Sequence, residues 1–396
     1  MIAYLKAFGE KHKLETLVDK AGNVLIKKPA TPGMENRKTV VLQSHIDMVC
    51  EKNNDVQHDF LTDPIETEID GEWLKAKGTT LGADNGIGVA TELAIVADDS
   101  IEDGPLECLF TVDEETGLTG AFELKEGFMS GDILLNLDSE DEGEIFIGCA
   151  GGIDSVAEFS YKEVEVPAGY FFFKVEVKGL KGGHSGGDIH LGRGNANKIL
   201  NRFLSRMANR QDLYLCEING GNLRNAIPRE AYAICAVPED AKHDVRTELN
   251  IFTSEVENEL AVTEPDLKLV LESETPRKMA IDQDTTTRLL KALYAAPHGV
   301  YAMSQDIPGL VETSTNLASV KMKPNHIIRI ETSQRSSILS ARNDMANTVR
   351  AVFQLAGADV TFGEGYPGWK PNPHSAILEV AAESYKRLFG VEAKVK

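Results

Sequence analysis

Short apolar segments, each followed by acidic or histidine side chains, recur between residues 40 and 138. Residues 40–42, 106–112 and 133–137 are largely apolar, and runs of this length between polar segments are typical of buried strands. The apolar positions of residues 86–98 instead fit one face of a partly buried helix. Because strands alternate with helical segments, we expect an α/β domain with a mixed, mostly parallel sheet.

The pattern of apolar positions changes after residue 152. Alternating strands such as 171–177 are followed by helices such as 196–208, an order typical of an α+β domain. A second round of helix, strands and helix covers residues 286–356. This order fits two similar halves, although we see no repeat at the level of single residues.

A stretch rich in glycine and proline follows the second round. Residues 363–373 have the composition of a hinge, and the apolar pattern of residues 375–388 predicts a final helix. We therefore predict that an α+β domain, residues 153–363, is inserted into a first domain formed by residues 1–152 and 364–396.

Length and charge limit the classes of protein to which the chain can belong. With 396 residues, 42% of them hydrophobic, it can bury a sizeable core, and its length favours two domains. Its 62 acidic and 41 basic residues give a formal charge of −21, which argues against nucleic acid or an anionic membrane as a partner. No apolar run approaches the roughly 20 residues of a membrane span. The N-terminus also lacks the organisation of a signal peptide, so we expect a cytoplasmic protein.

The polar residues that end the predicted strands are of the types that bind metal ions. His45, the pair Glu114 and Glu115, and Asp138 each follow a strand, and Asp84 precedes the predicted helix. Because the carboxyl ends of parallel strands meet at one edge of a sheet, these side chains should converge there. One imidazole and several carboxylates suit a hydrolytic metal centre, in which one carboxylate takes a proton from water.

Each of these residues also has an ordinary structural interpretation. A histidine at a strand end is usually a satisfied polar residue, although Asp47 points the same way and can accept the second ring N–H of His45. Asp84 can simply cap the helix that follows it, and the two glutamates can form an exposed turn. Asp138 begins an acidic run that is typical of a solvated loop. Only the conjunction of these residues favours a metal centre.

The order of these residues resembles that of a known family. His-x-Asp at 45–47, Asp-Asn-Gly at 84–86, Asp-Glu-Glu at 113–115, Leu-Asp at 137–138 and Gly-Gly-His-Ser-Gly at 182–186 are similar to motifs of the co-catalytic zinc metallopeptidases, which include carnosinases and aminoacylases. Within that family, the chain resembles the bacterial aminoacyl-histidine dipeptidases over almost its whole length. Four longer strings carry this likeness, at residues 32–38, 78–88, 148–154 and 223–230.

The resemblance implies a catalytic domain with two divalent metal ions and an inserted lid domain. Asp84 would bridge the two ions, His45 and Asp138 would complete one site, and Glu115 would bind the other. Zinc is the first expectation for both ions, with manganese or cobalt as alternatives, because such a donor set accepts all three.

The implied reaction is hydrolysis of the peptide bond of unblocked dipeptides, including Xaa-His dipeptides such as carnosine. A metal-bridging water would attack the carbonyl carbon, with Glu114 as general base, and Asp47 would orient His45. An aminoacylase or another exopeptidase of the family is one alternative, because the metal motifs are shared. A catalytically silent fragment that binds peptides or metal is another.

The inserted domain supplies further candidate residues through the same resemblance. His184 would stabilise the oxyanion, a role that suits a donor placed where negative charge develops. Asn225 and Arg335 would hold the terminal carboxylate of the substrate, Arg335 by a bidentate contact. By residue type alone, the glycine-rich segment around His184 is a simple turn. The inserted domain can either form a homodimer or contain two halves that mimic one.

The last metal-binding histidine of the family has no counterpart in this sequence. In the family it lies near the C-terminus after a further strand and helix, whereas His374 lies in a Pro-Asn-Pro-His turn. Family members also begin with a longer helical segment than the one that starts at Met1. We therefore expect a chain that is truncated at both ends and whose second metal site is one ligand short.

Overall fold

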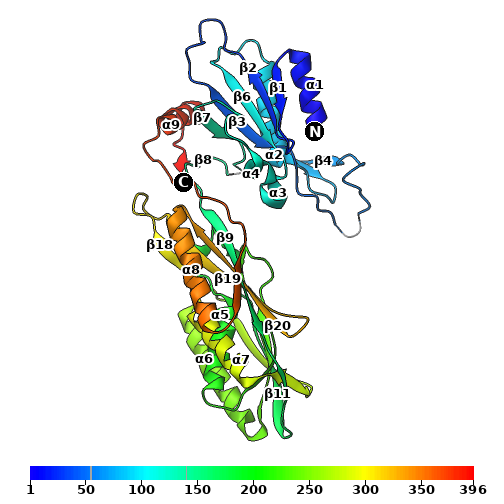
Figure 1. Cartoon of the computed structure of the whole chain (residues 1–396), viewed down its shortest axis with the longest axis vertical. Helices are drawn as coiled ribbons and strands as arrows, with labels where there is room; N and C mark the ends of the chain where they lie inside the picture. Colours follow the sequence, from blue (N-terminus) through cyan, green and yellow to red (C-terminus); the bar gives the residue numbers. More distant parts are fainter. Residues whose placement is uncertain (54–55, 140) are drawn as a thin grey trace. The chain divides into compact units, whose positions relative to one another are not determined.

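The computed structural model describes residues 1–53, 56–139 and 141–396, which pack as two compact units (Figure 1). The first unit consists of Met1–Ile145 and Ala376–Lys394, and the second of Phe146–Ser375 with the last two residues. The predicted assignment of a catalytic domain to 1–152 and 364–396, and of a lid to 153–363, stays a prediction. Among the described residues, no helix is both long enough and apolar enough to span a membrane.

The first unit is built on a five-stranded sheet in the order β1-β2-β6-β3-β7. Strands β6, β3 and β7 run parallel, whereas β1 and β2 form an antiparallel hairpin that pairs with the free side of β6. The predicted α/β class is confirmed, and the sheet is mixed because this hairpin joins the parallel strands. The strands are β1 (Glu15–Val18), β2 (Val24–Lys28), β3 (Val40–His45), β6 (Leu106–Thr111) and β7 (Ile133–Asn136).

Side chains alternate between the two faces of this sheet. Val24 and Ile26 of β2 pack in one cluster with residues of α1 (Ile2–His12) and α2 (Ala83–Ala97), whereas Leu25 packs in a cluster on the other face. The remaining elements of the unit are β4 (Thr67–Asp70), β5 (Trp73–Ala76), α3 (Glu114–Gly117), α4 (Thr119–Glu123), β8 (Glu144–Ile145), α9 (Ala376–Phe389) and the first residue of β22 (Lys394–Val395), the strand that pairs with β8.

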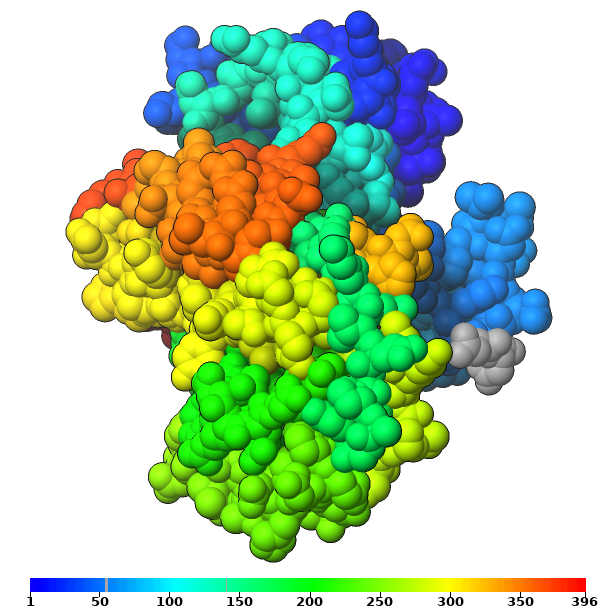
Figure 2. Space-filling view, turned by 60° about the horizontal axis from the view of Figure 1, so that its bottom comes forward, coloured from blue at the N-terminus to red at the C-terminus, as the bar shows by residue number. Residues whose placement is uncertain are grey.

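The second unit is built on a nine-stranded antiparallel sheet in the order β16-β11-β15-β13-β19-β20-β9-β21, with β18 also paired to β19. Figure 2 shows the atoms of this unit in colours from green to orange. The strands of the sheet are β9 (Gly151–Ser160), β11 (Tyr170–Lys178), β13 (Tyr214–Gly220), β15 (Ala231–Pro238), β16 (Lys268–Ser273), β18 (Gly299–Met303), β19 (Val311–Lys323), β20 (Ile327–Ser336) and β21 (Asp359–Phe362).

Four longer helices and several short elements complete the second unit. Asn195 caps one helix by accepting a hydrogen bond from the backbone amide of Lys198, and Asp282 caps another by accepting one from Thr285. The helices are α5 (Ala196–Ala208), α6 (Lys242–Glu259), α7 (Gln283–Ala295) and α8 (Leu339–Leu355). The short elements are β10 (Glu163–Glu165), β12 (Gly183–His184), η1 (Ile189–Leu191), β14 (Ala226–Ile227), η2 (Glu239–Ala241) and β17 (Met279–Ile281).

The nine-stranded sheet consists of two halves with the same topology. In chain order, one half is β11-α5-β13-β15-α6-β16, and the other is β9-α7-β19-β20-α8-β21. If the four strands of each half are numbered in chain order, they lie side by side in the sheet in the order fourth, first, third, second. The second strands of the two halves, β13 and β19, pair with each other and make one continuous sheet. The two rounds of elements in the sequence pattern are therefore two copies of one fold.

Candidate metal centre

The candidate residues of the first unit lie where its parallel strands end. His45, the last residue of β3, is opposite Thr111, the last residue of β6. Gln43 of β3 is opposite Asn136, the last residue of β7. The segments that follow these strands therefore leave the sheet at the same edge, as the sequence pattern predicts.

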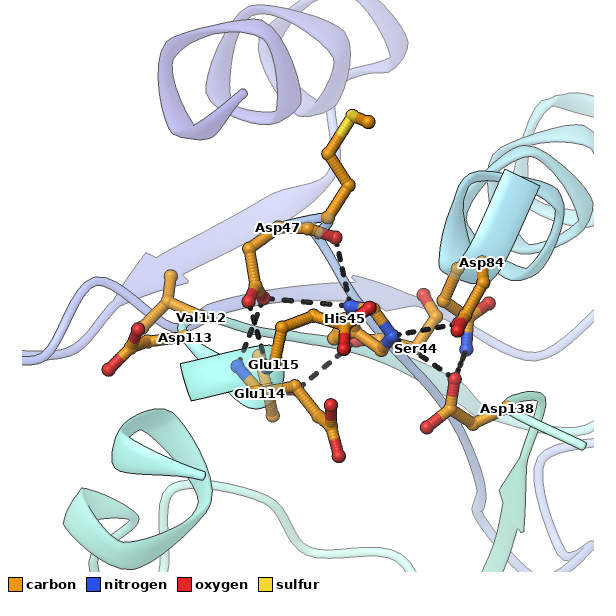
Figure 3. Close-up of polar contacts among 12 residues, drawn as sticks. Ser44, His45, Asp47, Asp84, Val112, Asp113, Glu114, Glu115 and Asp138 are labelled. Atoms are coloured by element: carbon orange, nitrogen blue, oxygen red, sulfur yellow. Dashed lines mark hydrogen bonds and ion pairs between the residues drawn. The ribbon is translucent and has the colours of Figure 1, made fainter. Parts of the chain in front are cut away.

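One group of candidate ligands surrounds the ring nitrogen His45 Nε2 (Figure 3). Nε2 lies 3.0 Å from Asp84 Oδ1 and 3.2 Å from Asp138 Oδ1, and the His45 side chain is only 1% exposed. Burial lowers the pKa of His45, but the charges of Asp138, Asp84 and Asp47 outweigh burial, so the pKa is raised overall. The imidazole is thus held against carboxylates in a site that favours positive charge.

The other ring nitrogen fixes the orientation of the imidazole. His45 Nδ1 lies 3.0 Å from the backbone carbonyl oxygen of Asp47, which can only accept a hydrogen bond. Nε2 also faces acceptors, the carboxylates of Asp84 and Asp138. With a cation among these carboxylates, the ring proton would belong on Nδ1 and the Nε2 lone pair would face the cation. This is the arrangement that a metal-binding histidine requires.

Asp84 does not cap the helix that follows it. The N-cap position of α2 is Gly82, which makes no side-chain capping bond, and the backbone of Asp84 is not helical. Asn85 Oδ1 instead accepts a hydrogen bond from the amide of Gly88 at 3.0 Å. The alternative in which Asp84 serves as the cap is therefore wrong, because Asn85 makes the capping bond.

Asn85 also contacts the group of candidate metal ligands, a contact that sequence reasoning missed. Its side-chain Nδ2 donates a hydrogen bond to Asp138 Oδ1, the oxygen that faces His45. Asn85 is buried, so this bond is partly shielded from water. The string Asp-Asn-Gly was the only signal in the sequence, and it does not show that the asparagine and Asp138 meet.

Glu114 and Glu115 open the short helix α3 beside His45. Asp47 Oδ1 accepts a hydrogen bond from the amide of Glu114 and Asp47 Oδ2 one from the amide of Glu115, both at 3.1 Å. Asp113, just before them, adopts a left-handed backbone conformation with φ of 53° that turns the chain into α3. The Asp47 carboxylate therefore connects the end of β3 to the segment that carries both glutamates.

Negative charge accumulates among these side chains. Burial and the charge of Asp138 raise the pKa of Glu114, and burial and the charge of Asp84 raise the pKa of Glu115. Burial also raises the pKa of Asp138, against the opposing effect of His45. Carboxylates that resist ionisation when crowded together are stabilised by a cation among them.

The donor atoms are close enough to hold metal ions. Those of His45, Asp84 and Asp138 all lie within 4.8 Å of one another, and so do those of His45, Glu114 and Glu115. Among the residues that the structure describes, these are the two groups with such spacing. His45 belongs to both groups in this geometry, whereas Asp84 was the expected bridging residue. The donor set fits divalent cations in chemistry and in spacing.

The three candidate residues of the second unit lie near one another. His184 is opposite Ala226 in the β12-β14 pair, and the amide of Ser185 donates to the carbonyl oxygen of Asn225 at 2.8 Å. Arg335 lies close enough for its charge to lower the pKa of His184, an effect second only to burial. The Nη1 of Arg335 donates to Tyr366 Oη at 3.2 Å. An imidazole, an amide and a guanidinium are therefore available in one region of this unit.

The chain resembles known peptidases in sequence and in structure. It is 47% identical over 386 residues to the cytosol non-specific dipeptidase of Escherichia coli K12, a match that covers 98% of this chain and 79% of that protein. The crystal structure of aminoacylhistidine dipeptidase from Vibrio alginolyticus matches with a TM-score of 0.91 at 45% identity, covering 100% of this chain and 80% of that one.

Two further matches concern the fold. The family model of the peptidase dimerisation domain matches residues 175–264, from within β11 to beyond α6. The structure of aminopeptidase PepT from Bacillus cereus has a TM-score of 0.55 at 16% identity, over 99% of this chain and 77% of that one. The dimerisation-domain match thus falls on one of the two topologically similar halves.

Proposed function

We propose that this chain, which belongs to the cytosol non-specific dipeptidase family of the M20 metallopeptidases, hydrolyses the peptide bond of unblocked dipeptides. Xaa-His dipeptides such as carnosine are among its substrates. The observation that carries the proposal is the position of His45 Nε2, which faces Asp84 and Asp138 at a sheet edge where Glu114 and Glu115 also lie. The names of the Escherichia coli and Vibrio relatives support this substrate class.

The metal-binding residues are assigned from the family resemblance together with this geometry. His45, Asp84 and Asp138 would hold one divalent ion, and Asp84 and Glu115 would hold the other. Zinc is the first choice and manganese or cobalt the alternatives, because imidazole and carboxylate ligands accept all three. When bound, such ions polarise a carbonyl oxygen and lower the pKa of water to about 7.

Glu114 is the general base in this proposal. Its carboxylate takes a proton from the attacking water and delivers it to the leaving amine. The raised pKa of Glu114 suits this task, because a base that binds protons weakly transfers them poorly near neutral pH. Asp47 positions this base by holding the backbone amide of Glu114.

The second unit supplies groups that bind the substrate. His184 donates a hydrogen bond to the carbonyl oxygen as negative charge develops on it. Arg335 and Asn225 bind the terminal carboxylate of the dipeptide, and the guanidinium does so through two parallel N–H bonds. The Nε of Arg335 has no hydrogen-bond partner within the described part of the chain, although it is buried, so a donor is free for an anionic ligand.

One preparation of the protein tests this function. Its zinc, manganese and cobalt content is measured first, and rates are then measured with carnosine, other dipeptides, a tripeptide and N-acetylated amino acids. Two ions per chain with hydrolysis of unblocked dipeptides support the proposal. Preference for acetylated amino acids would show an aminoacylase instead. One ion without hydrolysis of any substrate would show a catalytically silent binding protein. The Glu114→Gln variant serves as the control for a contaminating peptidase.

A homodimer in the cytoplasm is also part of the proposal. The match to a peptidase dimerisation domain supports self-association, and the name of the Escherichia coli relative supports the location. Strand β13 of the matched half is already paired with β19 of the same chain. A second copy would therefore bind through another surface. Light scattering should give twice the mass of one chain, and the mass of a single chain would contradict the dimer.

A further inference from the structure

His184 is tied to its own turn by three hydrogen bonds. Its backbone amide donates to Asp188 Oδ2 at 2.9 Å, and the amide of Asp188 donates to the carbonyl oxygen of His184 at 2.9 Å. The amide of Gly187 donates to the ring nitrogen His184 Nδ1 at 3.1 Å. The first two bonds close the turn, and the third fixes the imidazole within it.

The bond from Gly187 determines which ring nitrogen is free to carry the proton. A backbone N–H can only donate, so His184 Nδ1 must offer its lone pair. A neutral imidazole has a single proton, which then belongs on Nε2. Protonation of Nδ1 would place two donors against each other at 3.1 Å and would break this bond.

Residues outside the turn also hold it in place. Arg193 Nη1 lies 3.3 Å from Asp188 Oδ2 and donates to the carbonyl oxygen of Gly182 at 2.6 Å. The Glu264 carboxylate, only 2% exposed, accepts the amides of Lys181 and Gly194 at 2.8 Å each, on either side of the turn. Both ends of the loop around His184 are therefore held by buried or paired charges.

The charges around His184 also favour its neutral form. Burial and the Arg335 guanidinium lower the pKa of His184, while Asp188 acts in the opposite direction. The net pKa is below the ordinary value for histidine, a direction that favours the neutral ring.

We propose that the turn of residues 184–188 locks His184 as the neutral Nε2–H tautomer, with the Gly187 amide and Asp188 as positioning groups. Nε2 is then the single ring atom that can donate a hydrogen bond. The purpose of this tautomer rests on the proposed function: it offers the carbonyl oxygen of the substrate an N–H donor that the turn fixes before the reaction. A donor that needs no reorganisation during the reaction stabilises the developing charge most effectively.

Nitrogen NMR of the histidine rings tests the tautomer directly. The whole chain, labelled with ¹⁵N in its nine histidines, is studied at neutral pH by correlations between ring carbon-bound protons and ring nitrogens. The signal of His184 is assigned by its loss in His184→Gln. The expected spectrum shows an unprotonated Nδ1 and a protonated Nε2. An Nδ1–H tautomer, an imidazolium or the mixed signal of a freely exchanging ring would overturn the proposal.

Gly187 allows a matched pair of variants. Gly187→Pro removes the N–H, whereas Gly187→Ala keeps it. The alanine fits, because Gly187 lacks positive φ and an added Cβ would have His184 Nδ1, at 3.8 Å, as its single neighbour within 4 Å. The tautomer should become mixed in Gly187→Pro and stay unchanged in Gly187→Ala. An unchanged spectrum in folded Gly187→Pro would contradict the role of this amide.

Asp188 provides a second pair if the proline variant does not fold. Asp188→Asn keeps an acceptor for the His184 amide, and Asp188→Ala removes it. We expect a mixed tautomer in Asp188→Ala and an unchanged tautomer in Asp188→Asn. If the two variants gave the same spectrum, Asp188 would have no role in fixing the tautomer.

Kinetics separate this inference from the proposed function. Gly187→Pro should lose kcat on the order of a hundredfold, the usual cost of misplacing a reacting group, while keeping its metal content. Gly187→Ala should stay close to the wild type. A wild-type chain with the Nε2–H tautomer that hydrolyses no dipeptide would contradict the proposed function and still support the tautomer. An active chain with a different tautomer would overturn this inference alone.

Discussion

The backbone carbonyl of Asp47 lies 3.0 Å from His45 Nδ1, closer than the Asp47 carboxylate, whose Oδ1 lies 3.5 Å from the same atom. The carboxylate is instead shared between the amides of Glu114 and Glu115. The backbone of residue 47 therefore orients the imidazole, and its side chain holds the start of α3.

Asp47→Ala should lower activity without lowering metal content. The backbone carbonyl remains in the variant, so His45 keeps its orientation, but two amides of α3 lose their acceptor and Glu114 is displaced. We expect kcat to fall on the order of a hundredfold, as it does when a catalytic group is misplaced. Metal analysis and dipeptide hydrolysis are measured on the same samples. If the variant loses metal as His45→Ala does, the carboxylate of Asp47 orients the imidazole after all.

Glu114→Gln and Glu115→Gln should behave differently although they are neighbours. Glu114→Gln keeps the shape of the side chain but cannot accept a proton, so we expect about a hundredfold or greater loss in kcat with metal retained. Glu115→Gln should lose one of the two ions, because an amide is a weaker ligand than a carboxylate. Equal metal loss in both variants would contradict this division of roles.

Asp84→Ala should reduce the content of both ions and the stability that they provide. A ligand that binds only the folded state raises the midpoint of thermal unfolding. Removing metal with a chelator should therefore lower Tm of the wild type, and by much less in Asp84→Ala. The exposed Asp132→Ala is the matched control and should respond to the chelator as the wild type does. A normal metal content in Asp84→Ala would exclude Asp84 as a ligand.

Glu92 should make the protein less stable as the pH rises. Burial raises its pKa from 4.5 to about 8, against the opposing effects of Ser44 and Cys108, and the side chain is 0% exposed. The pKa of Glu92 is higher in the folded protein than in the unfolded chain, so protonation of Glu92 stabilises the folded state. This stabilisation is fully present at pH values below the pKa of the unfolded chain. It is lost as the pH rises through about 8.

The Glu92→Gln variant should lack this pH dependence. As the pH rises from about 5 to about 9, the wild type should lose stability that Glu92→Gln keeps. The free energy of unfolding of the variant should therefore rise relative to that of the wild type by at most roughly 5 kcal/mol, the free-energy equivalent of the pKa shift. Urea unfolding of metal-free protein at both pH values measures the difference. Glu68→Gln, an exposed substitution on β4, should show no such trend. Parallel pH profiles for wild type and Glu92→Gln would show that Glu92 does not titrate in this range.

The sequence by itself determined which residues end the central strands and of what chemical type they are. Apolar runs of strand length specify buried strands, and the ends of parallel neighbours meet at one edge. That reasoning places His45 and Asp138 together, and their distance of 3.2 Å agrees with it. The change in apolar pattern after residue 152 similarly predicts a second domain of different architecture.

Only the tertiary structure decided how those side chains are held. The contact from Asn85 to Asp138 spans 53 positions, and the Asp47 carboxylate reaches amides 67 and 68 positions away. Contacts at such separations leave no periodic pattern in the sequence, because they depend on where backbone amides lie after folding. The pairing of β13 with β19 is of the same kind. The sequence indicates two similar rounds of elements, but which edges of the two halves join depends on their packing.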